Sequence, residues 1–174
     1  MKIIRFLIII VELIVCYVLQ SSVCGHFTLN HTMPDLMMVI VVAVAYIKGS
    51  NAGILYGFCA GMILDLTYGT HLGFGALLYL FAGFLAGVFH KFYRKDDNIT
   101  PLLLIAACIF LQLNIYYVTE FVIQGKAEYG FYLKNIMLPK MVYTVLIGSV
   151  LYKLCQLSIS WSIRLDERNL KYYD

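Results

Sequence analysis

The sequence predicts an all-α fold, a polytopic bundle of helices in a membrane. Of its 174 residues, 61% are hydrophobic and 13% are charged, and the mean hydropathy is +0.82. The charges are clustered between long apolar runs, which is typical of membrane helices. These runs are continuous and lack the two-residue alternation of a membrane β-barrel. We expect one integral membrane domain over residues 1–160 and a charged cytoplasmic tail over 161–174.

The N-terminal half contains three apolar segments. As a helix at ~1.5 Å per residue, segment 3–22 reaches about 30 Å and spans the hydrocarbon core. The second segment ends at residue 47 and the third covers 52–66, so each reaches only about 21–23 Å. The turn 48–51 separates them. We therefore expect a short hairpin of the second and third helices, which either thins the bilayer or is held inside the bundle by flanking helices.

A helix start precedes the second segment. Thr32 can cap the helix, Pro34 suits its first turn, and Asp35 stands where the fourth member of a capping box reaches back. These residue types at this spacing predict a structural role, with ligand binding by Asp35 as the alternative.

The C-terminal half contains three further segments, which brings the expected number of membrane helices to about six. They cover residues 72–89, 101–123 and 136–160. The charged loop 90–97 separates the first two, and the polar and aromatic connection 125–135 separates the last two. Pro139 is expected in the first turn of the last helix.

The distribution of Lys and Arg predicts the orientation. Six spans place both termini on one side, which then holds ten of the 13 cationic residues. The opposite side holds Lys126, Lys134 and Lys140. Because cytoplasmic loops carry the excess of Lys and Arg, both termini are predicted in the cytoplasm. A hairpin that re-enters from outside would leave four full spans and the same orientation.

Glycines recur at every fourth position of the third segment. Gly53, Gly57 and Gly61 lie on one ridge of a helix, and the next position in this register is Asp65. Each glycine costs roughly 0.5–1 kcal/mol relative to Ala in a helix, so a close helix contact is expected to compensate. Gly83 and Gly87 form a second pair of this kind in the following segment. This pattern predicts helix packing or partner binding.

Polar side chains interrupt the apolar segments. A charge deep in a bilayer is penalised by about 2.5 kcal/mol or more unless it is protonated or paired. Glu12 is therefore expected to contact Gln20, Gln112 or Asn114. Asp65 is left with three interpretations, which are a cap of the next helix, a contact to a basic partner residue, or exposure to water. The intramembrane polar candidates are Glu12, Gln112, Asn114 and Glu120.

Catalytic and metal sites have no support in the sequence. The four histidines lack paired spacing on a helix face, and no nucleophile elbow, phosphate loop or zinc-protease motif occurs. We expect no catalytic residue, no cofactor, no metal and no nucleic-acid partner. A lipid-modifying enzyme would need a catalytic dyad at one membrane depth, and the sequence offers none.

The order of these motifs resembles the rod shape-determining protein family MreD over nearly the whole chain. A helix opened by Pro-Asp-Leu, a basic turn, a GxxxGxxxGxxxD run and a small-residue helix follow one another, and Arg5, Gln20 and Pro139 also fit. The tail 172–174 departs from the strongly basic ending expected of the family. The residues that carry the resemblance are Pro34, Asp35, Leu36, Gly53, Gly57, Gly61, Asp65, Gly69, Gly73, Gly83 and Gly87.

The resemblance implies a non-enzymatic scaffold of the bacterial cell-elongation complex in the inner membrane. Such a protein associates with the bitopic partner MreC and links peptidoglycan synthases indirectly to the MreB filament. The family is similar in fold to substrate-binding components of energy-coupling-factor transporters. The alternative is therefore a membrane subunit of a small-molecule transporter, with Asp65, Glu12 and Gln112 facing a cavity.

Overall fold

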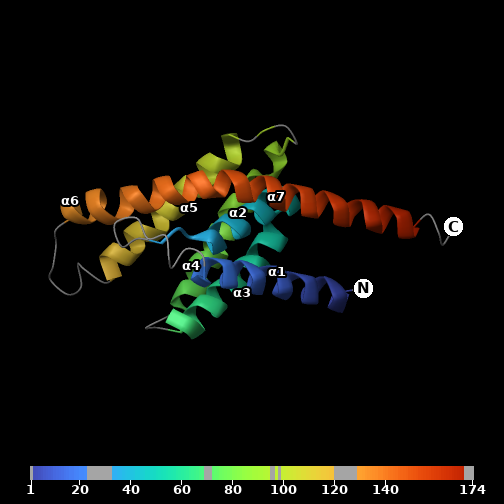
Figure 1. Ribbon diagram of the computed structural model, residues 1–174, viewed down its shortest axis with the longest axis horizontal. Coiled ribbons are helices and arrows are strands. Elements are labelled where there is room, and N and C mark those ends of the chain that lie inside the picture. The colour runs from blue at the N-terminus through green and yellow to red at the C-terminus, as the bar shows by residue number, and fades with distance from the viewer. Residues whose placement is uncertain are drawn as a thin grey trace.

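The computed structural model describes residues 2–22, 33–68, 72–94, 97, 99–119 and 129–170, with the backbone alone for 2–9 and 158–170. Every regular element in these ranges is a helix (Figure 1). In chain order the elements are α1 (Lys2–Ser22), α2 (Leu36–Lys48), α3 (Ser50–Tyr68), α4 (Phe74–Val88), η1 (Phe89–Phe92), α5 (Ile99–Tyr117), α6 (Tyr129–Tyr132), η3 (Leu133–Met137) and α7 (Leu138–Leu170).

Helix α2 lies at the centre of the fold. Its side chains from Leu36 to Tyr46 are all buried, as expected of a helix that is apolar on every side. It contacts α1, α3, α4, α5 and α7. With 13 residues it is about 20 Å long at ~1.5 Å per residue, shorter than the ~30 Å hydrocarbon core. The surrounding helices thus enclose this short helix inside the bundle.

The third helix is longer than the sequence predicted. Helix α3 has 19 residues, which is about 28 Å, so of the expected short hairpin only α2 is short. Its last turn continues to Tyr68, and there the Thr67 hydroxyl donates to the carbonyl oxygens of Ile63 and Leu64. The turn before α3 is made by Gly49, which has φ +93° and donates its N–H to the Ala45 carbonyl at 2.8 Å.

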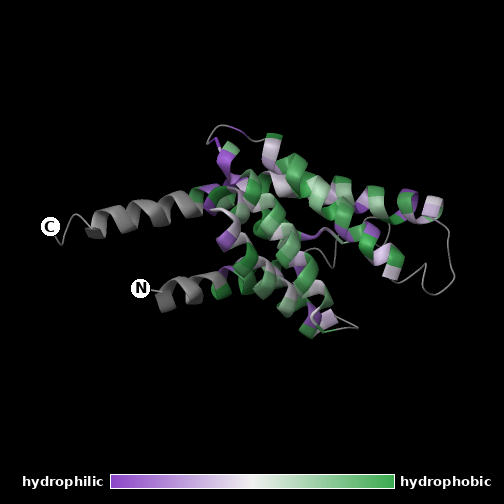
Figure 2. Cartoon of the chain, turned by 180° about the vertical axis from the view of Figure 1, so that it is seen from behind, coloured by the Kyte–Doolittle hydropathy of each residue, from purple (hydrophilic) through white to green (hydrophobic). Residues whose placement is uncertain are grey.

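Three described helical stretches are long and apolar enough to cross a membrane, namely Phe74–Phe92, Ile99–Tyr117 and Tyr129–Leu157. Ile10–Ser22 and Leu36–Lys48 are shorter apolar helices. Figure 2 shows the hydrophobic colours along the helices and the hydrophilic ones concentrated near helix ends and connections. A polytopic membrane bundle is therefore supported, while the number of six crossings stays a prediction.

The last helix begins earlier than the sequence predicted. The connection expected over 125–135 is helical from Tyr129, and the helix passes through η3 into α7. Within η3 the backbone widens into a π-turn, in which the Leu138 N–H bonds the Leu133 carbonyl five residues earlier. Pro139 follows directly. Because proline has no N–H to donate, a wide turn accommodates it inside a continuous helix.

The two ends of the described chain lie at the same end of the molecule. The start of α1 and the end of α7 point to the same end of the molecule (Figure 1), which is the arrangement that an even number of crossings produces. Helix α7 runs to Leu170, through the segment predicted as a tail. The division at residue 160 stays a prediction.

Candidate functional site

The glycines of α3 lie against the backbone of α4. A Cβ atom added to Gly57 would be 2.3 Å from the Tyr79 carbonyl oxygen, and one added to Gly61 would be 2.3 Å from the Ala76 Cα. Real Cβ contacts essentially never fall under 3.0 Å. The two backbones are therefore in direct contact, and at these positions only glycine fits without displacing the neighbouring helix.

The small residues of α4 complete the same contact from the other side. A Cβ at Gly83 would be 2.2 Å from the Gly53 carbonyl oxygen, and one at Gly87 would be 2.3 Å from the Ser50 Cα. We call these paired small residues of α3 and α4 the glycine seam. The seam runs along both antiparallel helices and forms the most extensive helix contact of the described chain. Its close van der Waals contacts offset the weak helix propensity of glycine.

Asp65 lies at the end of the glycine seam and joins α3 to the start of α4. Its side chain is buried, and Oδ2 accepts hydrogen bonds from the Gly73 N–H at 2.9 Å and the Ala76 N–H at 3.0 Å. These donors are the otherwise unpaired amides of a helix start. Of the three interpretations that the sequence allowed, the geometry is that of a cap for α4.

Asp35 occupies the start of α2 in a different way from the predicted capping box. The helix begins at Leu36, Asp35 is itself the N-cap, and its Oδ1 accepts the Met38 N–H at 3.0 Å. Aspartate is among the strongest N-cap residues, so no earlier cap is required. Pro34 precedes the helix instead of standing in its first turn, and Thr32 lies outside the described residues.

A buried polar cluster surrounds Asp35. The Tyr79 hydroxyl of α4 donates to Asp35 Oδ2 at 2.6 Å, and the Asp35 N–H donates to Thr144 Oγ1 of α7 at 3.1 Å. Asp35, Tyr79 and Thr144 are 4%, 2% and 0% exposed. The side chain of Gln112, from α5, also interacts with the Tyr79 hydroxyl. We call these four residues the Asp35 cluster, and it joins four helices.

Glu12 does not pair with the residues that the sequence predicted. Its Oε2 accepts a hydrogen bond from the Tyr56 hydroxyl of α3 at 2.8 Å. Gln20 Oε1 instead accepts the Met37 N–H at 3.1 Å. Both bonds attach α1 to the hairpin, because Glu12 and Gln20 lie two turns apart on one face of α1.

Asn114 also has partners of its own. Its Nδ2 donates to the Phe110 carbonyl at 2.8 Å, and its Oδ1 accepts from the Tyr129 hydroxyl at 3.1 Å. Glu120 lies outside the described residues. The expected contact of Glu12 with Gln20, Gln112 or Asn114 is therefore not the one formed, because the helices rotate these side chains toward different neighbours.

Sequence reasoning missed Tyr56, Tyr79 and Thr144. A hydroxyl within an apolar segment is the one signal that marks them, and with 14 tyrosines in the sequence this signal does not single out Tyr56 and Tyr79. Among the described residues, no group of three His, Cys, Asp or Glu side chains is arranged to hold a metal ion. The polar contacts that we describe are structural, since each either caps or stays within its own helix, as Asp35–Met38 and Asn114–Phe110 do, or joins one helix to another.

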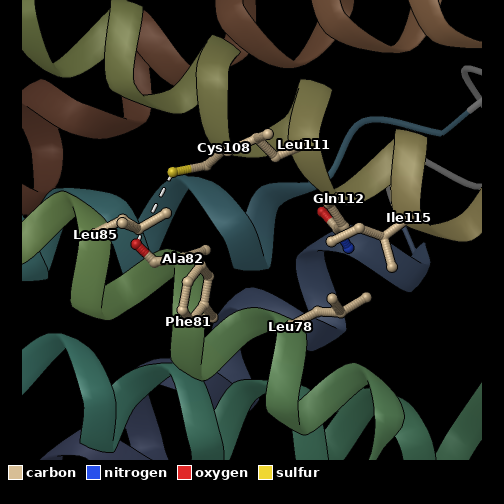
Figure 3. Close-up of a pocket in the computed structure, with 8 residues that line it drawn as sticks. All are labelled: Leu78, Phe81, Ala82, Leu85, Cys108, Leu111, Gln112 and Ile115. Carbon is tan, nitrogen blue, oxygen red and sulfur yellow. Dashed lines mark hydrogen bonds between the residues drawn. The ribbon is translucent and has the colours of Figure 1, made fainter.

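A cavity lies between α4 and α5, and its lining is apolar apart from Gln112 (Figure 3). Asp65 and Glu12, which the transporter alternative placed in a common cavity with Gln112, are not among its lining residues. The structure therefore does not bring these three side chains together in this cavity.

Comparison with known proteins gives one finding about the family. The family model described as rod shape-determining protein MreD matches residues 1–158, most of the chain. No curated protein and no solved structure matches.

Proposed function

The chain belongs to the rod shape-determining protein MreD family, and from this premise we propose that it is a scaffold of the bacterial cell-elongation complex. The family is one of non-enzymatic cell-shape proteins, so the role in rod shape determination requires no catalytic residue. As a scaffold the chain binds a bitopic partner of the MreC type in the membrane. Through this partner it links peptidoglycan synthases indirectly to the MreB filament.

The glycine seam is the observation that carries the scaffold proposal. A scaffold has to hold its binding surfaces in a fixed relation, and two helices in backbone contact along their length supply a rigid unit. The Asp65 cap fixes one end of this unit, and the Asp35 cluster attaches it to α2, α5 and α7. Rigidity of this kind suits a protein that positions partners.

The outer face of α1 is the surface that we propose for the partner helix. Its exposed apolar residues recur at the spacing of one helix face, while Glu12 and Gln20 attach the inner face to the bundle. A single membrane helix can pack along such a stripe. The exposed residues are Val11, Ile14, Val15, Val18 and Leu19.

We place the protein in the bacterial inner membrane with both termini in the cytoplasm. The excess of Lys and Arg on the side of the termini supports this orientation. The transporter alternative has less support, because Asp65, Glu12 and Gln112 act in separate contacts.

Complementation of cell shape tests the proposal. Cells that lack the protein are supplied with the wild-type chain or with Gly57→Leu, and Gly130→Leu is the control because a Cβ at Gly130 meets no atom within 4 Å. We expect rods with the wild type and the control, and rounded cells with Gly57→Leu at equal membrane abundance. Rods with Gly57→Leu would contradict the role of the glycine seam, and rounded cells with the control would show that any added side chain disturbs shape.

A further inference from the structure

An apolar groove runs between α4 and α5. It is a shallow depression in which about 20 Å³ admits a water-sized sphere, and the rest of its space is open to the surroundings. At its floor the Cys108 thiol lies 3.9 Å from the Ala82 carbonyl oxygen, which it approaches as a weak donor (Figure 3). The remaining lining residues are Leu78, Phe81, Leu85, Leu111, Gln112 and Ile115.

The groove is open toward the outside of the bundle. Phe81 of α4 and Leu111 of α5, which form its walls, are 54% and 48% exposed. Both helices belong to the stretches that are apolar enough to cross a membrane. Inside a bilayer this opening therefore faces hydrocarbon, which suits an acyl chain.

Cationic side chains stand where the α4 wall of the groove ends. Exposed Phe89 and Phe92 continue this wall into η1, and Lys91 and Arg94 are exposed beside them. Lys91 follows Leu85 by six residues and Leu78 by 13, which at ~1.5 Å per residue is about 9 Å and 20 Å. Since one leaflet of the hydrocarbon core is about 15 Å deep, a lipid with its headgroup at Lys91 places its acyl chain at the depth of the groove.

Two further lysines belong to the same end of the bundle. His90 Nδ1 is 2.9 Å from the carbonyl oxygen of Tyr46, two residues before Lys48. Tyr46 also shares a buried cluster with Tyr152, which precedes Lys153. Lys48 and Lys153 are both exposed. The ends of α2, α4 and α7 thus bring positive charge to one level of the bundle.

The described acidic side chain of this loop is already engaged. Hydrogen bonds from Thr100 and Ile99 lower the pKa of Asp97 first, and the charge of Arg94 adds only the last contribution. Asp97 caps the start of α5, and the exposed guanidinium of Arg94 remains accessible to an anion from the membrane.

We propose that the groove between α4 and α5 binds one anionic phospholipid, with an acyl chain between the helices and the phosphate at Lys91 and Arg94. Charge-assisted hydrogen bonds from Lys and Arg to phosphate are strong, and basic residues at the membrane surface select anionic lipids. A partner helix, about 10 Å wide, is too large for this space and explains none of the cations. The proposal stands independently of the scaffold function.

Native mass spectrometry of the full-length protein tests the headgroup site. The detergent-solubilised protein is offered equal amounts of phosphatidylglycerol and phosphatidylcholine with identical acyl chains. We expect about a tenfold preference for phosphatidylglycerol, the order expected when two basic residues face an anionic headgroup. Lys91→Gln with Arg94→Gln reduces this ratio to near one, whereas Lys134→Gln, an exposed lysine on η3, leaves it unchanged.

A second pair of variants tests the acyl-chain site. Leu111→Trp fills the groove and is expected to reduce the retention of both lipids severalfold. Leu146→Trp adds the same bulk at a 63% exposed position of α7. It is expected to leave the retention of both lipids unchanged. Equal retention of both lipids by the wild type, an unchanged ratio in the Lys91 and Arg94 double variant, or normal retention in Leu111→Trp would overturn the proposal. So would a crosslink from Leu111→Cys to an acidic partner protein in place of lipid.

Discussion

The hydroxyl of Tyr79 donates a hydrogen bond to the carboxylate of Asp35 at 2.6 Å, and it joins α4 to the N-cap of the central helix. Both side chains are buried. Tyr79 also supplies the carbonyl oxygen that Gly57 faces in the glycine seam. This one residue therefore connects the rigid pair α3 and α4 to α2.

Removing the Tyr79 hydroxyl tests this connection. Tyr79→Phe leaves a buried carboxylate with one donor fewer, and hydrogen bonds to charged groups contribute about 1.5–3 kcal/mol. We expect a loss of this size in the free energy of unfolding, measured by denaturant titration in detergent. Tyr129→Phe is the matched control, because Tyr129 is 40% exposed and its hydroxyl bonds Asn114 near the surface. Equal losses in both variants would contradict a special role for the buried bond.

Adding one methyl group to the glycine seam tests its packing. Gly57→Ala forces the backbone of α4 outward, and overpacking of this kind costs about 1–3 kcal/mol. Gly130→Ala, where the added Cβ meets nothing within 4 Å, is expected to be neutral or to gain up to about 1 kcal/mol from helix propensity. Thermal unfolding in detergent measures both. A Gly57→Ala protein as stable as the wild type would mean that the two helices separate without cost.

Local sequence patterns predict part of this fold. Long apolar runs predict membrane helices because hydropathy is a property of each segment, and a four-residue spacing places glycines on one ridge without knowledge of the neighbour. Helix ends are harder, as α3 and the helix from Tyr129 show. There the helices continue beyond the apolar runs, to Tyr68 in α3 and through a π-turn before Pro139 in the last helix.

The sequence does not reveal which side chains of different helices bind each other. Glu12 and Tyr56 are separated by 44 positions, as are Asp35 and Tyr79. Which tyrosine meets which carboxylate depends on the rotation and depth of whole helices, and no local pattern encodes these. The match over residues 1–158 identifies the family, but only the packing of the helices in the structure shows which residues are in contact.

The Asp65 carboxylate is expected to hold the start of α4. Asp65→Ala removes the acceptor of the Gly73 and Ala76 N–H groups, and the loss of a cap costs about 0.5–2 kcal/mol. Hydrogen exchange should accelerate at these two amides while the middle of α4 stays protected. Thr67→Ala is the control, because its hydroxyl bonds carbonyls of its own helix. Unchanged exchange at Gly73 and Ala76 would exclude the cap.

The start of α5 is expected to depend on pH. The pKa of Asp97 is lowered, first by the hydrogen bond from the Thr100 hydroxyl and then by the Thr100 N–H. A lowered folded-state pKa means that the carboxylate stabilises the turn above its unfolded pKa, ~3.9, and that this contribution is lost as pH falls through the folded value. Amide chemical shifts of Ile99 and Thr100 should stay constant from about pH 7 to 5 and move below about 4. In Asp97→Asn this acid-induced movement should disappear, and its persistence would assign it to another group.

Affinity purification of the full-length protein in mild detergent, with mass spectrometry of the proteins that accompany it, tests the scaffold most directly. The wild type and Gly130→Leu are expected to recover a protein with one membrane span and a periplasmic domain. Gly57→Leu, present in the membrane at the same level, is expected to recover it at least severalfold less. Recovery of no such partner by the wild type, or equal recovery by Gly57→Leu, would contradict a scaffold that depends on the glycine seam.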